Sequence, residues 1–207
     1  MNAIDLAGKL ITLEGLDFTG KSTLIRRLET LLRERGIDVV VSREPGGTRV
    51  GERVRSLLLT RDHAEMLPLS ELLLFMVSRA QHTHEVILPA LGEGKTVLTS
   101  RYRLSSVAYQ GYGRGLDLEL VRRLNEAATE GRQADVTLLI DLPVDIALGR
   151  RRGGGDRIEQ EDHEFYNRVR QGYLELVADD PHAHVVDGTG SVDEVFAKLL
   201  GPLNLSF

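Results

Sequence analysis

The chain of 207 residues contains no cysteine, and this absence excludes disulfide bonds and thiolate chemistry. Basic residues do not predominate either, because 26 Lys and Arg stand against 31 Asp and Glu, a formal net charge of −5. Such a balance gives no basic surface field and does not indicate a nucleic-acid partner. Residues 1–6 lack the features of a secretory signal, and no apolar run reaches the roughly 18 residues that a membrane span needs. We therefore expect a cytoplasmic protein without a membrane partner.

What is present is an ordinary globular composition, with 42% hydrophobic and 28% charged residues. A chain of this length suits one α/β domain with a substantial core. No internal repeat, low-complexity segment or linker divides the sequence. We predict a single domain over residues 1–207.

One stretch near the start, residues 15–22, has the phosphate-binding pattern G-x-x-x-x-G-K-S. Its glycines let backbone N–H groups wrap a phosphate chain, Lys21 supplies charge to the β- and γ-phosphates, and Ser22 offers a hydroxyl to Mg²⁺. An apolar run at 10–13 and helical periodicity over 22–35 give the strand–loop–helix context of such a site, which disfavours a chance match. We therefore predict a nucleotide-binding P-loop. The expected phosphate contacts are Gly15, Leu16, Asp17, Phe18, Thr19, Gly20, Lys21, Ser22 and Thr23.

Strand-like and helical segments alternate along the rest of the chain. Helices are expected at 50–59, 117–130 and 165–178, and at 68–91, which is apolar almost all round and should be buried; glycines at 111–115 suggest a flexible loop. Ser191 and Glu194 form a capping box for a last helix. Strands are expected at 10–13, 37–41, 96–99, 136–140 and 184–187, and the one at 37–41 is expected to be buried. The pattern predicts a three-layer α/β fold with five parallel strands.

Arginines follow two of the predicted strands, Arg43 after 37–41 and Arg101 after 96–99. Ligands bind at the carboxyl ends of strands in an open parallel sheet, so the pair indicates a second anion beside the first. A solvated turn is the alternative for Arg43. Phe75 and Arg79 lie four residues apart and share a helix face, where they could stack on a base and bind its edge; a core ring and a surface charge are the alternative.

Residues 150–157 place arginines on both sides of three glycines. A nucleic-acid patch is disfavoured because acidic residues follow at once, and a solvated loop remains an alternative. We favour a mobile lid over about 150–160 that carries cations to a phosphate. The lid cations are Arg151, Arg152 and Arg157.

The sequence shows no obvious general base, although transfer of a phosphoryl group to water or an alcohol usually needs one. A phosphate acceptor does not, because its oxygen is already an anion; such a reaction needs cancellation of charge. The positive charge for this cancellation would come from Lys21, Arg43, Arg101, the lid arginines and Mg²⁺. We infer phosphotransfer to a monophosphate.

The motifs also resemble those of the bacterial thymidylate kinase (dTMP kinase) family, over essentially the whole chain and in the family's order. They are the P-loop, R-E-P-G-G-T at 43–48, Phe75 with Arg79, the R-Y at 101–102 with Y-Q-G at 109–111, and D-R-I-E at 156–159. The resemblance implies a P-loop kinase fold that transfers the γ-phosphoryl group of ATP to dTMP, giving dTDP and ADP for dTTP synthesis. It also implies a homodimer.

The resemblance further assigns residues to dTMP. Phe75 would stack on thymine and Arg79 would bind its edge, with Ser106 and Gln110 beside the base. Arg43 and Arg101 would hold the phosphate. Asp17 would contact the 3′-hydroxyl, and Tyr109 would disfavour a 2′-hydroxyl.

Two positions, Phe18 and Ser100, depart from the family pattern; Phe18 is bulkier than the small residues expected there. Phe18 and Thr19 occupy the variable loop positions without an arginine, which is similar to the type that supplies catalytic arginines from its lid. Ser100 stands where the family usually has Asp, which removes a carboxylate near the metal. The alternatives are therefore a kinase for another pyrimidine monophosphate, or a weakly active nucleotide-binding homologue.

Overall fold

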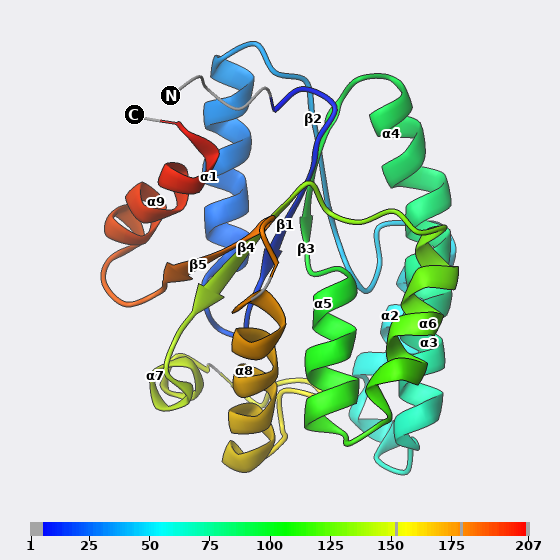
Figure 1. Cartoon of the computed structure of the whole chain (residues 1–207). Coiled ribbons are helices and arrows are strands. Elements are labelled where there is room, and N and C mark those ends of the chain that lie inside the picture. The colour runs from blue at the N-terminus through cyan, green and yellow to red at the C-terminus, as the bar shows by residue number, and fades with distance from the viewer. Residues whose placement is uncertain (1–5, 152, 179, 206–207) are drawn as a thin grey trace.

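A computed structural model describes residues 6–151, 153–178 and 180–205. Its centre is a parallel sheet of five strands in the order β2-β3-β1-β4-β5 (Figure 1). The predicted α/β class and the five-stranded parallel sheet are confirmed. The strands are β1 (Leu10–Glu14), β2 (Val39–Arg43), β3 (Thr96–Ser100), β4 (Val136–Asp141) and β5 (Ala183–Asp187).

Burial follows the position of each strand in the sheet. All five residues of β1, the middle strand, are buried, as expected for a parallel strand covered on both faces. The run at 37–41 was expected to be a buried strand, and this is wrong: β2 begins at Val39, lies at the edge of the sheet and leaves Val41 37% exposed. A continuous apolar run does not distinguish an edge strand from a central one.

Helices cover both faces of the sheet. The helices α1 (Lys21–Glu34) and α9 (Val192–Leu200) pack on one face, where Leu24, Leu28 and Leu32 of α1 are buried at helical spacing (Figure 1). The predicted capping box of Ser191 and Glu194 begins α9. The other elements are α2 (Arg49–Leu59), η1 (Arg61–His63), α3 (Pro68–His82), η2 (Thr83–Ile87), α4 (Leu88–Gly92), α5 (Arg103–Ser106), η3 (Val107–Gly113), α6 (Leu118–Thr129), α7 (Val144–Gly149), α8 (His163–Ala178) and η4 (Gly201–Leu203).

The glycines at 111–115 do not form the expected flexible loop. Helix α5 continues into the π-helical segment η3, and Gly111 and Gly113 are buried inside it. A Cβ on Gly113 would lie 2.7 Å from the ring of Phe165 on α8. Glycine is present here because it lets two helices approach closely.

The segment 68–91 is helical, but it is neither uniform nor fully buried. A π-helical stretch, η2, separates α3 from α4. Leu69, Leu73 and Val77 of α3 are 46%, 45% and 48% exposed, so the expectation of a helix buried all round is wrong. Their spacing of four residues places them on one face of the helix. No helix in the described part of the chain is long and apolar enough to cross a membrane.

Candidate active site

The P-loop joins β1 to α1 and needs glycine at its first and sixth positions. Gly15 has φ 132°, and a Cβ there would lie 2.5 Å from the carbonyl oxygen of Ile140 on β4. Gly20 has φ 88° and precedes the first turn of α1, whose N–H groups face the loop. Both conformations are ones that residues with a Cβ rarely adopt. The loop is therefore shaped for close approach of an anion to backbone N–H groups.

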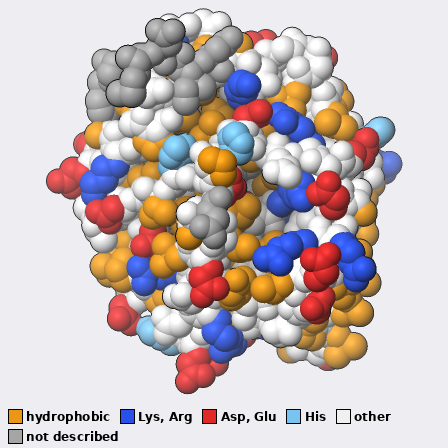
Figure 2. Space-filling view, in the orientation of Figure 1, with side chains coloured by type: hydrophobic (Ala, Val, Ile, Leu, Met, Phe, Trp, Pro, Cys, Tyr) orange, Lys and Arg blue, Asp and Glu red, His pale blue; other side chains and the backbone are white. Residues whose placement is uncertain are grey.

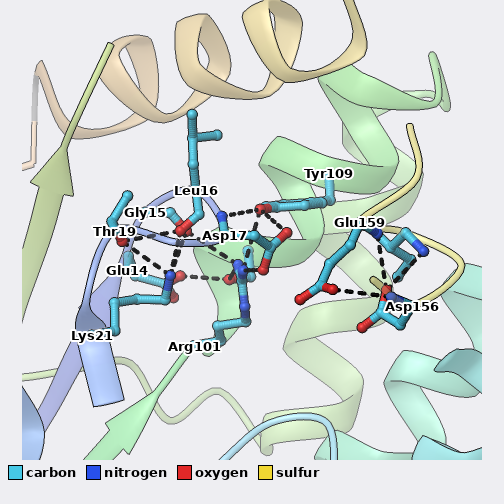
Figure 3. Close-up of polar contacts among 12 residues, drawn as sticks. Glu14, Gly15, Leu16, Asp17, Thr19, Lys21, Arg101, Tyr109, Asp156 and Glu159 are labelled. Atoms are coloured by element: carbon cyan, nitrogen blue, oxygen red, sulfur yellow. Dashed lines mark hydrogen bonds and ion pairs between the residues drawn. The ribbon is translucent and has the colours of Figure 1, made fainter. Parts of the chain in front are cut away.

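Lys21 lies folded back over this loop (Figure 3). Its Nζ donates to the carbonyl oxygens of Gly15 (3.2 Å) and Leu16 and to Thr19 Oγ1 (3.2 Å). Burial, together with the charge of Arg101, lowers the pKa of Lys21 to about 7, although Asp17 and Glu14 oppose this. A polyanion in the loop would give the ammonium group better partners than carbonyl oxygens.

Two cavities lie next to the loop. The first, of about 390 Å³, we call the phosphate pocket. The second, of about 110 Å³, lies deeper between α2, α3 and η3, and we call it the inner pocket. The phosphate pocket is lined by Asp17, Phe18, Gly20, Lys21, Ser22, Thr23, Arg43, Glu44, Arg55, Ser100, Arg101, Arg150 and Glu159. The inner pocket is lined by Asp17, Glu44, Pro45, Arg55, Leu59, Phe75, Arg101, Ser105, Ser106, Tyr109, Gln110, Asp156, Ile158 and Glu159.

Asp17, Arg101 and Tyr109 form a network where the two pockets meet (Figure 3). Arg101 Nη2 donates to the Asp17 carboxylate, and the Tyr109 hydroxyl donates to Asp17 Oδ2 at 2.9 Å. Burial raises the pKa of Asp17, but the charges of Arg101 and Lys21 outweigh it and hold the pKa below its usual value. Burial lowers the pKa of Arg101 and the charge of Asp17 raises it, and the net result is a raised pKa. The site therefore keeps Asp17 ionised and Arg101 charged at its centre.

Arg79 lies behind the inner pocket and is 1% exposed. Its guanidinium donates to Glu44 (2.7 Å), to Ser106 Oγ (2.8 Å) and to the Tyr102 carbonyl oxygen (2.8 Å). A further bond goes to Asn125. The guanidinium has five N–H groups, so these bonds occupy four of them, and Arg79 itself lines neither pocket. The sequence did not indicate that Glu44, in the turn after β2, would hold Arg79.

Arg43 is half-exposed and lines only the phosphate pocket, where its Nη2 lies 3.1 Å from both carboxylate oxygens of Glu52. Arg55 lines both pockets, and its Nη1 donates to the Pro45 carbonyl oxygen at 2.9 Å. Sequence reasoning missed Arg55. The available signal was its position four residues before Leu59, on the helix face toward the pocket.

The arginines at 150–157, the predicted lid, take different positions. Arg150, which the sequence argument did not select, lines the phosphate pocket. Arg151 donates to the Glu159 carbonyl oxygen at 2.6 Å. Arg157 lies outside both pockets, 2.7 Å from Glu71 on α3, and donates to the Leu58 carbonyl oxygen at 3.0 Å. Arg152 lies outside the described residues. The structure thus places Arg150 at the phosphate pocket, while Arg157 would have to leave Glu71 to reach it.

Oxygen ligands for Mg²⁺ are available but few. Ser22, Ser100 and Glu159 line the phosphate pocket with hard oxygen donors of the kind that Mg²⁺ prefers. The carboxylates of Asp17 and Glu44 also line it, but they are bonded to Arg101 and Arg79. No group of three His, Cys, Asp or Glu in the described part of the chain could hold a metal ion by itself. This donor set fits an ion held mainly by substrate phosphates and water.

Comparison with known proteins agrees with this geometry. The family model for thymidylate kinase matches residues 13–199. A thymidylate kinase of Caldanaerobacter subterraneus subsp. tengcongensis is 48% identical over 189 residues, 90% of each chain, and one of Kosmotoga olearia is 48% identical over 193 residues, 92% of each. The crystal structure of thymidylate kinase from Ehrlichia chaffeensis superposes with a TM-score of 0.78 at 34% identity, covering 94% of this chain and 98% of that one. The chain belongs to the thymidylate kinase family.

Proposed function

We propose that the two pockets are the two halves of the thymidylate kinase reaction, in which the γ-phosphoryl group of ATP is transferred to dTMP to give dTDP and ADP. The phosphate pocket takes the ATP phosphates and the inner pocket takes dTMP. The observation that carries this division is that Arg101, Asp17, Arg55 and Glu159 line both pockets, so reacting groups in the two would meet there.

On the ATP side, the backbone of the P-loop holds the phosphates, with contacts over residues 15–23. Lys21 leaves its carbonyl partners and binds the β- and γ-phosphates. Ser22 would hold Mg²⁺ together with the phosphates and water, with Glu159 on the opposite side of the pocket. The ion would neutralise charge on the β- and γ-phosphates and fix their geometry.

On the dTMP side, Arg101 and Arg55 hold the phosphate, and Arg43 can join them only by leaving Glu52. Asp17 binds the 3′-hydroxyl of the sugar, and Tyr109, whose hydroxyl donates to Asp17, limits the space near the 2′ position. The thymine ring lies deepest. Its contacts are Phe75 by stacking, Arg79 and Ser106 at the edge, and Gln110 beside it.

The chemical step needs no general base from the chain. An anionic oxygen of dTMP forms the new bond to the γ-phosphorus as the bond to the β–γ bridging oxygen breaks, and the electron pair leaves with ADP. The chain contributes alignment and positive charge, with Lys21 on the transferred group and Arg101 between donor and acceptor. Arg150, Arg151 and Arg152 of the lid add charge on closing, and Arg157 does so if the closed lid releases it from Glu71.

A homodimer is also part of this proposal. Leu69, Leu73 and Val77 on α3 and Leu57 on α2 are each 45–48% exposed, and the two helices pack together; we call these four residues the apolar strip. A second copy of the chain would cover this strip. Light scattering should give a dimer mass for the wild type and a monomer mass for the double substitution Leu73→Glu, Val77→Glu; unchanged dimer mass would reject this face.

Acidic and basic side chains are interspersed over the face of the molecule in Figure 2. We therefore propose no nucleic-acid partner for this protein, and we propose that it is cytoplasmic.

The substrate assignment is tested by initial rates of ADP release with dTMP, dUMP, dGMP, CMP and AMP as acceptors. Family membership favours dTMP, and we expect the highest kcat/KM for it. A clear preference for another monophosphate would reject the inner-pocket assignment. Binding of ATP and dTMP without formation of dTDP would instead point to an inactive homologue.

A further inference from the structure

Glu14 is a fully buried carboxylate with no established task. It is the last residue of β1, directly before the P-loop, and is 0% exposed. It lines neither the phosphate pocket nor the inner pocket. Oε1 accepts the Tyr102 N–H at 2.8 Å, and Oε2 accepts the hydroxyls of Ser105 (2.6 Å) and Tyr173 (3.1 Å). A charged group in this position is costly to bury, which calls for a reason.

The donors that converge on Glu14 surround Arg101. Arg101 has φ 68°, in the left-handed region that a side chain with a Cβ rarely occupies. Its own N–H donates to the Leu13 carbonyl oxygen at 3.0 Å, and the next N–H, that of Tyr102, donates to Glu14. The end of β1 thus holds the backbone on both sides of the unfavourable conformation.

The same network reaches the Arg101 side chain. Arg101 Nη1 lies 3.3 Å from Ser105 Oγ and 3.4 Å from the Tyr173 hydroxyl, the two groups that also donate to Glu14. Ser105 Oγ and the Tyr173 hydroxyl are 2.8 Å apart, but each has a single hydrogen, so the two cannot both donate to Glu14 and also bond to each other. Glu14 therefore fixes the oxygen atoms against which the guanidinium rests.

We propose that Glu14 is a positioning residue for Arg101, acting through the Tyr102 N–H, Ser105 and Tyr173 to hold the guanidinium between the two pockets. A carboxylate suits this role because its two oxygens accept all three bonds. Burial raises the pKa of Glu14 and the hydrogen bonds from Ser105 and Tyr173 lower it, with a net rise. Since Arg101 faces dTMP in the proposed function, on which this inference rests, loss of Glu14 should weaken dTMP binding more than ATP binding.

Thr12 offers a matched control. It precedes Glu14 by two residues on β1, faces the same side, and lines the same cavity of about 210 Å³ behind the sheet. Its hydroxyl donates to Thr137 on β4 at 3.2 Å and has no bond to the segment around Arg101. Thr12→Val therefore breaks a buried polar contact of the same strand without touching the Arg101 network.

Calorimetric titration of the full chain with dTMP and, separately, with ATP tests the proposal. We expect Glu14→Ala to weaken dTMP binding about 10-fold or more and ATP binding less than about threefold. Glu14→Asp, which keeps the charge but is one methylene shorter, should weaken dTMP binding about fivefold, and it serves if the alanine variant does not fold. Glu14→Gln should stay within about threefold of the wild type, because Oε1 is retained and both hydroxyls can turn to accept from the amide. Thr12→Val should lower the melting temperature and leave both affinities unchanged.

Three outcomes would overturn the inference: unchanged dTMP binding in Glu14→Asp, an equal loss of dTMP and ATP binding, or a glutamine variant as weak as the aspartate variant. Arg101→Ala separates this failure from failure of the proposed function. If Arg101→Ala loses dTMP affinity while the Glu14 variants keep it, only the positioning role is wrong. If Arg101→Ala also keeps its dTMP affinity, the assignment of the inner pocket is wrong.

Discussion

The P-loop and the inner pocket differ in how the chain builds them. The loop is one stretch, residues 15–22, whose contacts come from its own backbone and from the helix that follows. The inner pocket is assembled from separate segments: the loop itself, the turn after β2, α2, α3, η3 and the lid. A local site can be damaged by one change in the loop. An assembled site also depends on groups behind its lining, such as Arg79, which bonds to Glu44, and Glu71, which bonds to Gln110. The two sites should therefore respond differently to substitution.

The largest expected effect is on the local site. Lys21→Ala should reduce kcat by about 10³-fold, because it removes the charge that follows the transferred phosphoryl group. Affinity for dTMP should stay within about threefold of the wild type, because Lys21 lines only the phosphate pocket. Steady-state rates and dTMP titration measure the two. Equal losses in both would show that the pockets are not separable.

This difference also explains what the sequence could predict. The P-loop, the five-stranded parallel sheet and the capping box of α9 depend on local spacing, and they were predicted with nearly correct bounds. Arg55, Glu44 and Arg150 were missed. Spacing places Arg55 on one helix face with Leu59, but it does not show that this face lines a pocket, which forms only when α2, β2 and residues 150–160 meet. Most of the proposed base contacts were reached through family resemblance, not through spacing.

Local patterns also gave three wrong expectations, the buried strand at 37–41 and the two that follow. Glycines at 111–115 suggested a mobile loop, but the distant ring of Phe165 is what requires glycine at 113. The apolar surface of α3 suggested complete burial, but part of it is exposed on the outer side of the molecule. For Gly113 the residue that matters, Phe165, is distant in the sequence. For α3 the local sequence does not show that no other described element covers its exposed face.

Arginine placement gives the next largest effect and tests the assembled site directly. Arg55→Ala should raise the KM for dTMP about 30-fold with little change for ATP, because Arg55 reaches into the inner pocket. Arg43→Ala should have a smaller effect, since Arg43 lines only the phosphate pocket and pairs with Glu52.

Arg53→Ala is the matched control for both substitutions, because Arg53 is an exposed residue of the same helix as Arg55. It should leave both KM values unchanged. If Arg43→Ala raised the KM for dTMP more than Arg55→Ala did, Arg43 and not Arg55 would be the main contact of the dTMP phosphate, as the sequence suggested.

Protonation of Lys21 gives a smaller effect that again concerns only the local site. With its pKa lowered to about 7 before ATP binds, Lys21 is largely neutral at pH 8 and must take up a proton to bind phosphates. ATP affinity should therefore fall about fivefold from pH 7 to pH 8, with uptake of nearly one proton at pH 8. Calorimetry in buffers of different ionisation enthalpy measures this uptake. Lys21→Met should abolish the uptake, and dTMP binding should show no such dependence.

The smallest expected effect concerns the position where the two sites meet. Ser100 ends β3, lines the phosphate pocket, and stands beside Arg101 in the chain. Ser100→Asp would add a carboxylate to a donor set that otherwise depends on Ser22 and Glu159, so the concentration of Mg²⁺ needed for half-maximal rate should fall about threefold. The gain should be modest, because the new charge also attracts Arg101 and competes with the dTMP phosphate for it. A titration of the initial rate with Mg²⁺ at saturating ATP measures both effects. A rise in the KM for dTMP without any change in the Mg²⁺ requirement would show that position 100 belongs electrostatically to the assembled site and not to the local one.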